Sequence, residues 1–149
     1  MYPQSKGIAS YGRVAHVETN PIKQIVMLYD GAIKFLNMTA ADIENNDIPA
    51  KAEHSGRALE ILCYMQSILN FELGGDAAVG LDNLYRSIIN LVLRGSAELD
   101  PQIMRKAAEL LSPVRDAWET NARESIEPIA TGSSITLPPL TAGFGVSAA

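Results

Sequence analysis

At 149 residues, with 47% hydrophobic and 19% charged side chains, the chain is long enough to form one domain with a substantial hydrophobic core. The net charge of −5, with Lys and Arg scattered along the chain, argues against nucleic-acid binding, and apolar runs such as Ile25-Val-Met-Leu28 are too short to span a membrane. The N-terminus lacks the apolar stretch of a signal peptide and the single cysteine permits no intrachain disulfide, so we expect a cytoplasmic (cytosolic) protein without membrane insertion.

Helix start and stop signals divide the middle of the chain into four segments. Asn20-Pro21 and Asp100-Pro101 each combine an N-cap residue with a proline at the first helical position. Gly74-Gly75 is typical of a helix stop, and Pro113 predicts a kink in the last helix. The predicted helices span about residues 20–46, 49–73, 76–96 and 101–124.

These helices predict an all-α fold. Because the connections between them are only a few residues long, neighbouring helices should pack antiparallel in an up-down four-helix bundle. We therefore expect three parts: an N-terminal extension (1–19), the bundle (20–126) and an uncharged extended C-terminal tail (127–149), in which residues 128–149 carry no charged side chain.

The apolar residues exceed what a core requires. On the first three helices the predicted core faces are Ile22, Ile25, Val26, Tyr29, Ala32, Ile33, Leu36, Ala40 and Ile43; Ala58, Leu62, Met65, Leu69 and Leu73; and Leu81, Tyr85, Ile88 and Val92. The first helix widens its face with Leu28 and Phe35, and the third is flanked by Leu84, Leu91 and Leu93. Of these we expect Leu28, Leu84 and Leu91 to be largely interior. The second helix carries another stripe, rotated by on the order of 100° from its core face, formed by Ile61, Tyr64, Ile68 and Phe71. Left bare, that stripe would form a patch larger than soluble monomers usually expose, so we expect the chain's own tails, another copy or a partner to cover it.

The sequence offers no set of catalytic or metal-binding residues. The two histidines, His16 and His54, complete no Glu-x-x-His motif, and Glu53 and His54 point in different directions on a helix. Cys63 lies among apolar neighbours, which is typical of inert packing. We therefore expect a protein that is not an enzyme and that has no metal or cofactor.

Four motifs in order resemble those of the FliS family, the bacterial flagellar secretion chaperones that hold flagellin. They are Tyr11 with Val17-Glu-Thr-Asn-Pro21, Met27-Leu-Tyr-Asp-Gly-Ala-Ile33, Leu69-Asn-Phe-Glu-Leu-Gly-Gly-Asp76 leading into Asn83-Leu-Tyr85, and Val114-Arg-Asp-Ala-Trp118. The sequence departs from the family pattern at Leu73, Pro113 and the tail beyond residue 127, and by having Thr19-Asn-Pro21 where Thr-x-x-Pro is common.

The resemblance implies a cytosolic chaperone that binds the disordered C-terminal region of flagellin, prevents premature polymerisation and presents the client to a component of the flagellar export gate. We expect Ile61, Tyr64, Ile68 and Phe71 to bind the client, with Leu28 and Phe35 as further contacts. It also implies that the N-terminal segment covers the same surface before the client arrives, through Tyr2, Ile8 and Tyr11.

Two alternatives stay open at this point. One is a self-associating structural or regulatory bundle with no flagellin client, and a weak homodimer is compatible with either reading. The other concerns what covers the surface at rest: the apolar tail stretch Ile135-Thr-Leu-Pro-Pro-Leu140 is a second candidate, because it would imitate a client segment.

Overall fold

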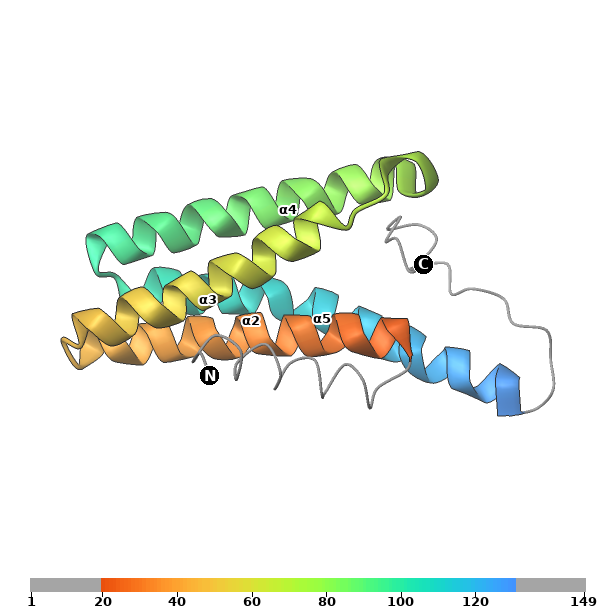
Figure 1. Cartoon of the computed structure of the whole chain (residues 1–149), viewed down its shortest axis with the longest axis horizontal. Coiled ribbons are helices and arrows are strands. Elements are labelled where there is room, and N and C mark those ends of the chain that lie inside the picture. Colours follow the sequence, from red (N-terminus) through yellow and green to blue (C-terminus); the bar gives the residue numbers. More distant parts are fainter. Residues whose placement is uncertain (1–19, 131–149) are drawn as a thin grey trace, which may run out of the picture.

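The computed structural model describes residues 20–130, which form four helices joined by three short turns. The helices are α2 (Pro21–Glu44), α3 (Ile48–Ser67), α4 (Phe71–Glu98) and α5 (Pro101–Ala130). They run up-down-up-down (Figure 1), which confirms the predicted antiparallel bundle. Helix α2 packs extensively along both α3 and α5, whereas α4 contacts α3 and α5 more sparsely.

The starts of the helices follow from side-chain caps. Asn20 Oδ1 accepts a hydrogen bond from the backbone N–H of Ile22 at 2.9 Å, and Asp100 Oδ1 accepts one from Gln102 at 2.9 Å. Asp47 caps α3 in the same way, through the N–H of Ala50 at 3.1 Å. Each cap satisfies a backbone donor that has no partner within its helix, so the local sequence fixes where these helices begin.

The boundary between α3 and α4 differs from the prediction. Helix α3 ends at Ser67, and Asn70 caps a new helix by accepting a hydrogen bond from the N–H of Leu73 at 3.0 Å. Gly75, with φ 52° and ψ −128°, lies at a kink within α4 instead of ending the preceding helix. This backbone conformation is essentially restricted to glycine, so the Gly-Gly pair turns the first helical turn of α4 away from the rest of the helix.

The last helix also differs in length. Helix α5 continues through Pro113 and reaches Ala130, beyond both the predicted helix end near residue 124 and the expected bundle boundary at 126. Pro113 is exposed, so its ring projects away from the core.

Most of the predicted core is confirmed. On α2 every predicted core residue is buried except Ile33, which packs half-buried against the core, and on α4 all four predicted residues are buried. Of the residues predicted for the second helix, Ala58, Leu62 and Met65 are buried on α3, and Leu69, in the turn after α3, is half-buried. Leu73 is the error: it is 76% exposed, because it follows the end of α3 and no longer shares that helix's phase.

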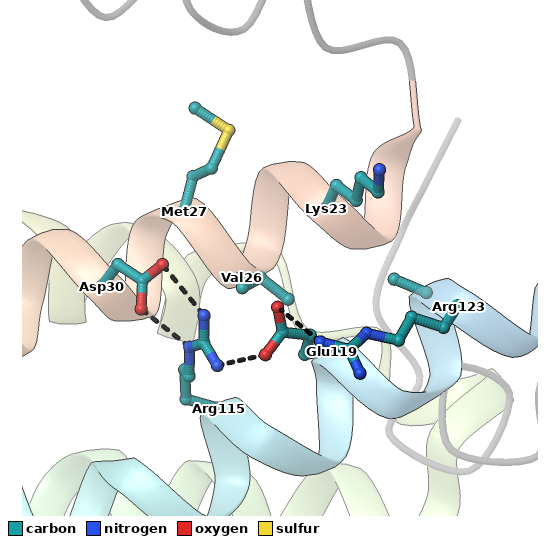
Figure 2. A pocket seen from close by; sticks show the side chains of 8 residues that line it. Lys23, Val26, Met27, Asp30, Arg115, Glu119 and Arg123 are labelled. Carbon is teal, nitrogen blue, oxygen red and sulfur yellow. Dashed lines mark hydrogen bonds and ion pairs between the residues drawn. The ribbon is translucent and has the colours of Figure 1, made fainter.

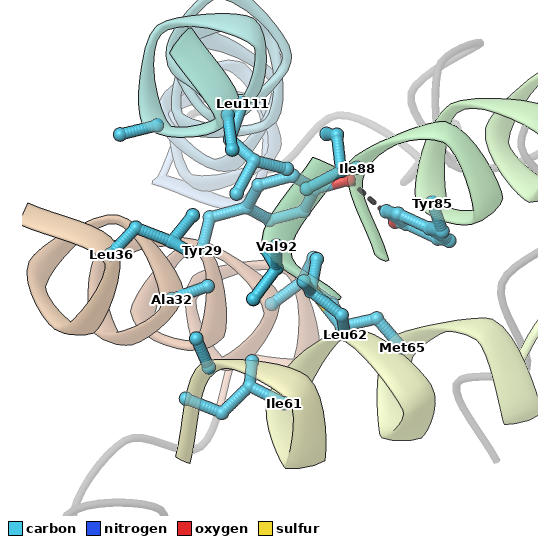
Figure 3. Packing of buried hydrophobic residues seen from close by; sticks show 14 of the residues in the cluster. Tyr29, Ala32, Leu36, Ile61, Leu62, Met65, Tyr85, Ile88, Val92 and Leu111 are labelled. Atoms are coloured by element: carbon cyan, nitrogen blue, oxygen red, sulfur yellow. Dashed lines mark hydrogen bonds between the residues drawn. The ribbon is translucent and has the colours of Figure 1, made fainter. Parts of the chain in front are cut away.

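Three polar side chains meet inside this core. The hydroxyls of Tyr29 on α2 and Tyr85 on α4 are 2.5 Å apart (Figure 3), and Trp118 on α5 packs into the same buried cluster. All three side chains are at most 2% exposed. Because buried polar groups are costly when unpaired, the hydrogen bond between the two tyrosines favours one alignment of α2 and α4 over others.

This tyrosine pair should make stability fall at alkaline pH. Burial raises the pKa of Tyr29 to about 12, and burial together with the neighbouring Tyr29 raises the pKa of Tyr85 as well. Both shifts disfavour the phenolate in the folded state, so their contribution is fully present below pH ~10 and is lost as pH rises toward 12 and above. Each tyrosine should remove about 1.4 kcal/mol of unfolding free energy per pH unit above pH ~10.

Urea unfolding at several pH values between 8 and 11 measures this slope. The chain with Tyr85→Phe has one such group fewer, so its stability should fall less steeply above pH ~10, whatever its stability at pH 8. Equal slopes for the two chains would contradict the buried pair.

Two glycines of α4 should respond in opposite directions to alanine. A Cβ on Gly95 would lie 3.0 Å from Ile103 Cγ2 and 3.1 Å from Ile103 Cβ, whereas a Cβ on Gly80 would meet no atom within 4 Å. We expect Gly95→Ala to lower the unfolding free energy by about 1–3 kcal/mol through overpacking. Gly80→Ala should raise it by up to about 1 kcal/mol through helix propensity. Urea unfolding of both variants is the measurement, and a stabilised Gly95→Ala chain would contradict the close approach of α4 and α5.

Candidate functional site: an apolar surface at the α3–α4 turn

The register of α2 against α3 is fixed by contacts along their junction. His54 Nδ1 on α3 lies 2.6 Å from Asp42 Oδ2 on α2, and its ring stacks on Phe35 with centroids 6.0 Å apart. Further along, a Cβ on Gly31 would lie 3.2 Å from Ile61 Cδ1, so α2 and α3 approach closely where α2 has no side chain. The approach of Gly31 to Ile61 fixes how the two antiparallel helices are aligned. One helical turn further along, Leu28 on α2 therefore lies level with Tyr64 on α3.

The predicted second stripe of α3 is divided by the fold. Ile61 is buried, with only 8% of its surface exposed, and it reaches toward α2 and Ala32 (Figure 3). Its side chain therefore supports the α2–α3 contact from within and does not lie on the surface. Tyr64, one turn later, is 53% exposed, and Ile68 at the end of the helix is half-buried. Leu28 and Phe35 on α2 are half-buried against the core and line the same junction.

Two further exposed apolar residues lie where α3 turns into α4, while others, such as Ile48 and Leu93, are spread over the bundle. Phe71 begins α4 and is 49% exposed, and Leu73 follows it within the same capped helical turn. The break at residues 68–70 and the kink at Gly75 hold this single turn apart from the rest of α4, so its large side chains face outward. We call the four residues Tyr64, Ile68, Phe71 and Leu73 the turn surface.

The turn surface is polar at its margins but carries little positive charge. Glu60, Glu72 and Asp76, which neighbour it in the chain, are all exposed. Cys63, the only cysteine of the chain, precedes Tyr64 and is exposed, so the expectation that it packs among apolar neighbours is wrong. The arrangement provides apolar contact area with an acidic rim and suits binding of an apolar segment more than chemistry.

A second feature lies between α2 and α5, near the start of α2. There a groove of about 320 Å³ is lined by Val26, Met27 and Ala122 and by the charged residues Lys23, Asp30, Arg115, Glu119 and Arg123. Arg115 spans the groove: its Nε donates to Asp30 at 2.7 Å, and Nη1 donates to Glu119 (Figure 2). The hydrogen bond to Asp30 raises the pKa of Arg115 above its already high ordinary value, so this arginine is a fixed cation that links α2 to α5.

Sequence reasoning missed this groove and missed Leu73 as a surface residue. The groove joins Lys23 and Asp30 to residues some ninety positions later in the chain, and no local pattern signals such a pairing. Leu73 would have been found only by recognising Asn70 as a helix cap.

The structure places no other chemistry beside these features. Within residues 20–130, no group of three or more His, Cys, Asp and Glu side chains is arranged to hold a metal ion. In the same part of the chain, no helix has the length and apolarity needed to cross a membrane.

A family model described as "Flagellar protein FliS" matches residues 5–125, which include all of α2, α3 and α4 and most of α5. The chain belongs to the FliS family. A relative from Vibrio cholerae, named flagellar secretion chaperone FliS, is 35% identical over 100 residues, covering 67% of this chain and 74% of the relative. A relative of the same name from Salmonella typhimurium is 32% identical over 124 residues, covering 80% of this chain and 91% of the relative.

Family membership confirms the resemblance inferred from the four motifs. Three of them build the features described above: the second supplies Tyr29 and Gly31, the third forms the α3–α4 turn, and the fourth contributes Arg115 and Trp118. The FliS match ends at residue 125, so the uncharged tail falls outside it. Tyr2, Ile8 and Tyr11, predicted as a self-capping segment, lie outside the described residues.

Proposed function

We propose that this chain is a cytosolic flagellar secretion chaperone that binds the disordered C-terminal region of flagellin. The relatives' names support the chaperone role. The observation that carries the client site is the turn surface: large apolar side chains remain exposed on a bundle whose core is otherwise closed, with Tyr64 at 53%, Phe71 at 49% and Leu73 at 76%.

Client binding would proceed by burial of apolar area. A disordered segment that orders on binding loses conformational entropy, so a few well-buried anchors must supply most of the affinity. Tyr64, Ile68 and Phe71 are the proposed anchors, and Leu28 and Phe35 extend the contact along the α2–α3 junction. Ile61 acts from beneath by holding α3 against α2.

The proposed consequence for flagellin is that its own assembly surface stays covered. A C-terminal region held on the chaperone is not free to pack against another flagellin, which prevents premature polymerisation in the cytosol. The bound pair would then be presented to a component of the export gate. Before the client arrives, a segment of the chain itself would cover the surface, and the client would displace it. The two candidates are the N-terminal segment with Tyr2, Ile8 and Tyr11 and the C-terminal tail. None of these steps requires catalysis or a cofactor.

The test is a calorimetric titration of the chain with a C-terminal flagellin segment from the same organism, at several temperatures. We expect one-to-one binding with a negative heat-capacity change, the mark of apolar burial. Light scattering of the free chain, measured at several concentrations, tests the alternative of a self-associating bundle. Stable oligomers that do not bind the segment would support that alternative and contradict the chaperone role.

A further inference from the structure

The turn surface and the end of α5 lie at the same end of the bundle. In Figure 1 the α3–α4 turn, the start of α2 and the final turns of α5 all lie toward the right-hand end of the long axis. The chain that follows Ala130 therefore starts from the end of the molecule where Tyr64, Phe71 and Leu73 are exposed.

The segment that starts there has the composition of something that packs on an apolar surface. Residues 131–149 carry no charged side chain and include Ile135, Leu137 and Leu140 around the pair Pro138-Pro139. Without charges, such a segment loses little solvation free energy on contact with an apolar surface, and the prolines reduce the entropy that it loses. Beside the acidic rim of Glu60, Glu72 and Asp76, an uncharged segment meets no repulsion.

The length of chain is also sufficient. Residues 135–140 follow Ala130 by five to ten positions, and an extended chain of that length spans up to roughly 15–35 Å. Helix α5 packs directly against α4, and packed helices lie about 8–10 Å apart, so this stretch is longer than the separation of α5 from its neighbour.

We propose that the C-terminal tail of this chain, through Ile135-Thr-Leu-Pro-Pro-Leu140, binds the turn surface intramolecularly and competes with whatever else binds there. The tail lies beyond the FliS match, which ends at residue 125, so this self-covering is an addition to the family's common core. Tail binding itself does not depend on the proposed flagellin client. Only the competition with that client rests on the proposed function.

The lone cysteine provides a direct test. Cys63 is exposed beside Tyr64, so a second cysteine introduced in the full-length chain by Thr136→Cys should form an intramolecular disulfide under mild oxidation. Two control chains keep this cysteine pair and the same tail length: one adds Leu137→Ser with Leu140→Ser, the other Phe71→Ser with Leu73→Ser. We expect disulfide formation to be at least about tenfold slower in both controls, because each removes one side of the apolar contact.

Equal rates in all three chains would show that the tail is merely within reach, and would overturn the proposal. So would a disulfide that forms only between two molecules, since the occupant would then be a second copy. Hydrogen exchange gives an independent readout: deletion of residues 131–149 should speed amide exchange at residues 64–73 several-fold. If deletion of residues 1–19 does so instead, the N-terminal segment is the occupant and the proposal fails.

The functional test is competition between the tail and the flagellin segment. Deletion of the tail should raise the affinity for the flagellin segment about three- to tenfold, and the Leu137→Ser, Leu140→Ser chain should behave alike. Unchanged affinity in a chain that binds flagellin would contradict competition. A chain that binds no flagellin, with or without the tail, but still shows the disulfide result would contradict the proposed function and leave tail binding supported.

Discussion

Replacement of Trp118 by alanine is expected to lower the free energy of unfolding by about 3–5 kcal/mol, the typical loss for a large buried aromatic side chain. Trp118 is 0% exposed and packs from α5 into the cluster that also holds Tyr29 on α2 and Tyr85 on α4. The substitution leaves a cavity between helices where the indole ring packed. Urea unfolding followed by far-ultraviolet circular dichroism measures the change.

Two further variants serve as comparisons. Trp118→Phe fills part of the cavity, so it should lose clearly less stability than Trp118→Ala. Tyr64→Ala removes an aromatic ring that is 53% exposed, and it should change stability by less than about 1 kcal/mol. If Trp118→Ala were as mild as Tyr64→Ala, the role of Trp118 as a central core residue would be wrong.

Simultaneous replacement of Tyr64 and Phe71 by serine is expected to weaken binding of the flagellin C-terminal segment about 100-fold. Anchor residues at protein interfaces contribute more than 1 kcal/mol each, and two losses of about 1.4 kcal/mol multiply to a factor of about 100. Both side chains are about half exposed in the free chain, so the fold should survive their loss. Calorimetric titration of the variant against the unmodified chain is the measurement.

The matched control uses exposed apolar residues elsewhere on the bundle. Val79 and Leu93 on α4 are 48% and 53% exposed, and they lie outside the turn surface. Their joint replacement by serine should leave the affinity within about twofold. Equal losses from the two double variants would mean that client binding is not localised at the α3–α4 turn.

The fold was predictable where a local signal coincided with the helical period. The Asn20 cap, the proline that follows it and the apolar repeat of α2 agree on one helix with one buried face, and the structure confirms both. The core face of α4 was predictable from its apolar repeat alone, since the start of this helix was predicted wrongly.

The prediction failed at the α3–α4 turn because two signals of similar strength competed. Gly74-Gly75 is typical of a stop, but Asn70 caps the helix four residues earlier, and the glycines form a kink instead. The buried face of a helix ends where the helix ends. Because the end of α3 was predicted too late, Leu73 was assigned to the core, although it is exposed. Ile61 was misassigned in the opposite sense, because the close approach of α3 to Gly31 is a tertiary contact that periodicity does not contain.

The sequence therefore predicted that an apolar surface exists on the bundle, but not which residues form it. The surplus of apolar residues on the second helix indicated a binding surface, and Tyr64 and Phe71 were correctly placed in the open. The α2–α5 groove was not foreseen, since Asp30 and Arg115 meet only in the folded bundle.

The central claim is that flagellin binds at the turn surface, and hydrogen exchange of the full-length chain with and without the flagellin segment tests it most directly. We expect slower exchange concentrated at residues 60–73, with weaker protection at residues 24–35 along the α2–α3 junction. Protection confined to the α2–α5 groove around Asp30 and Arg115, or to the outer face of α4, would contradict it.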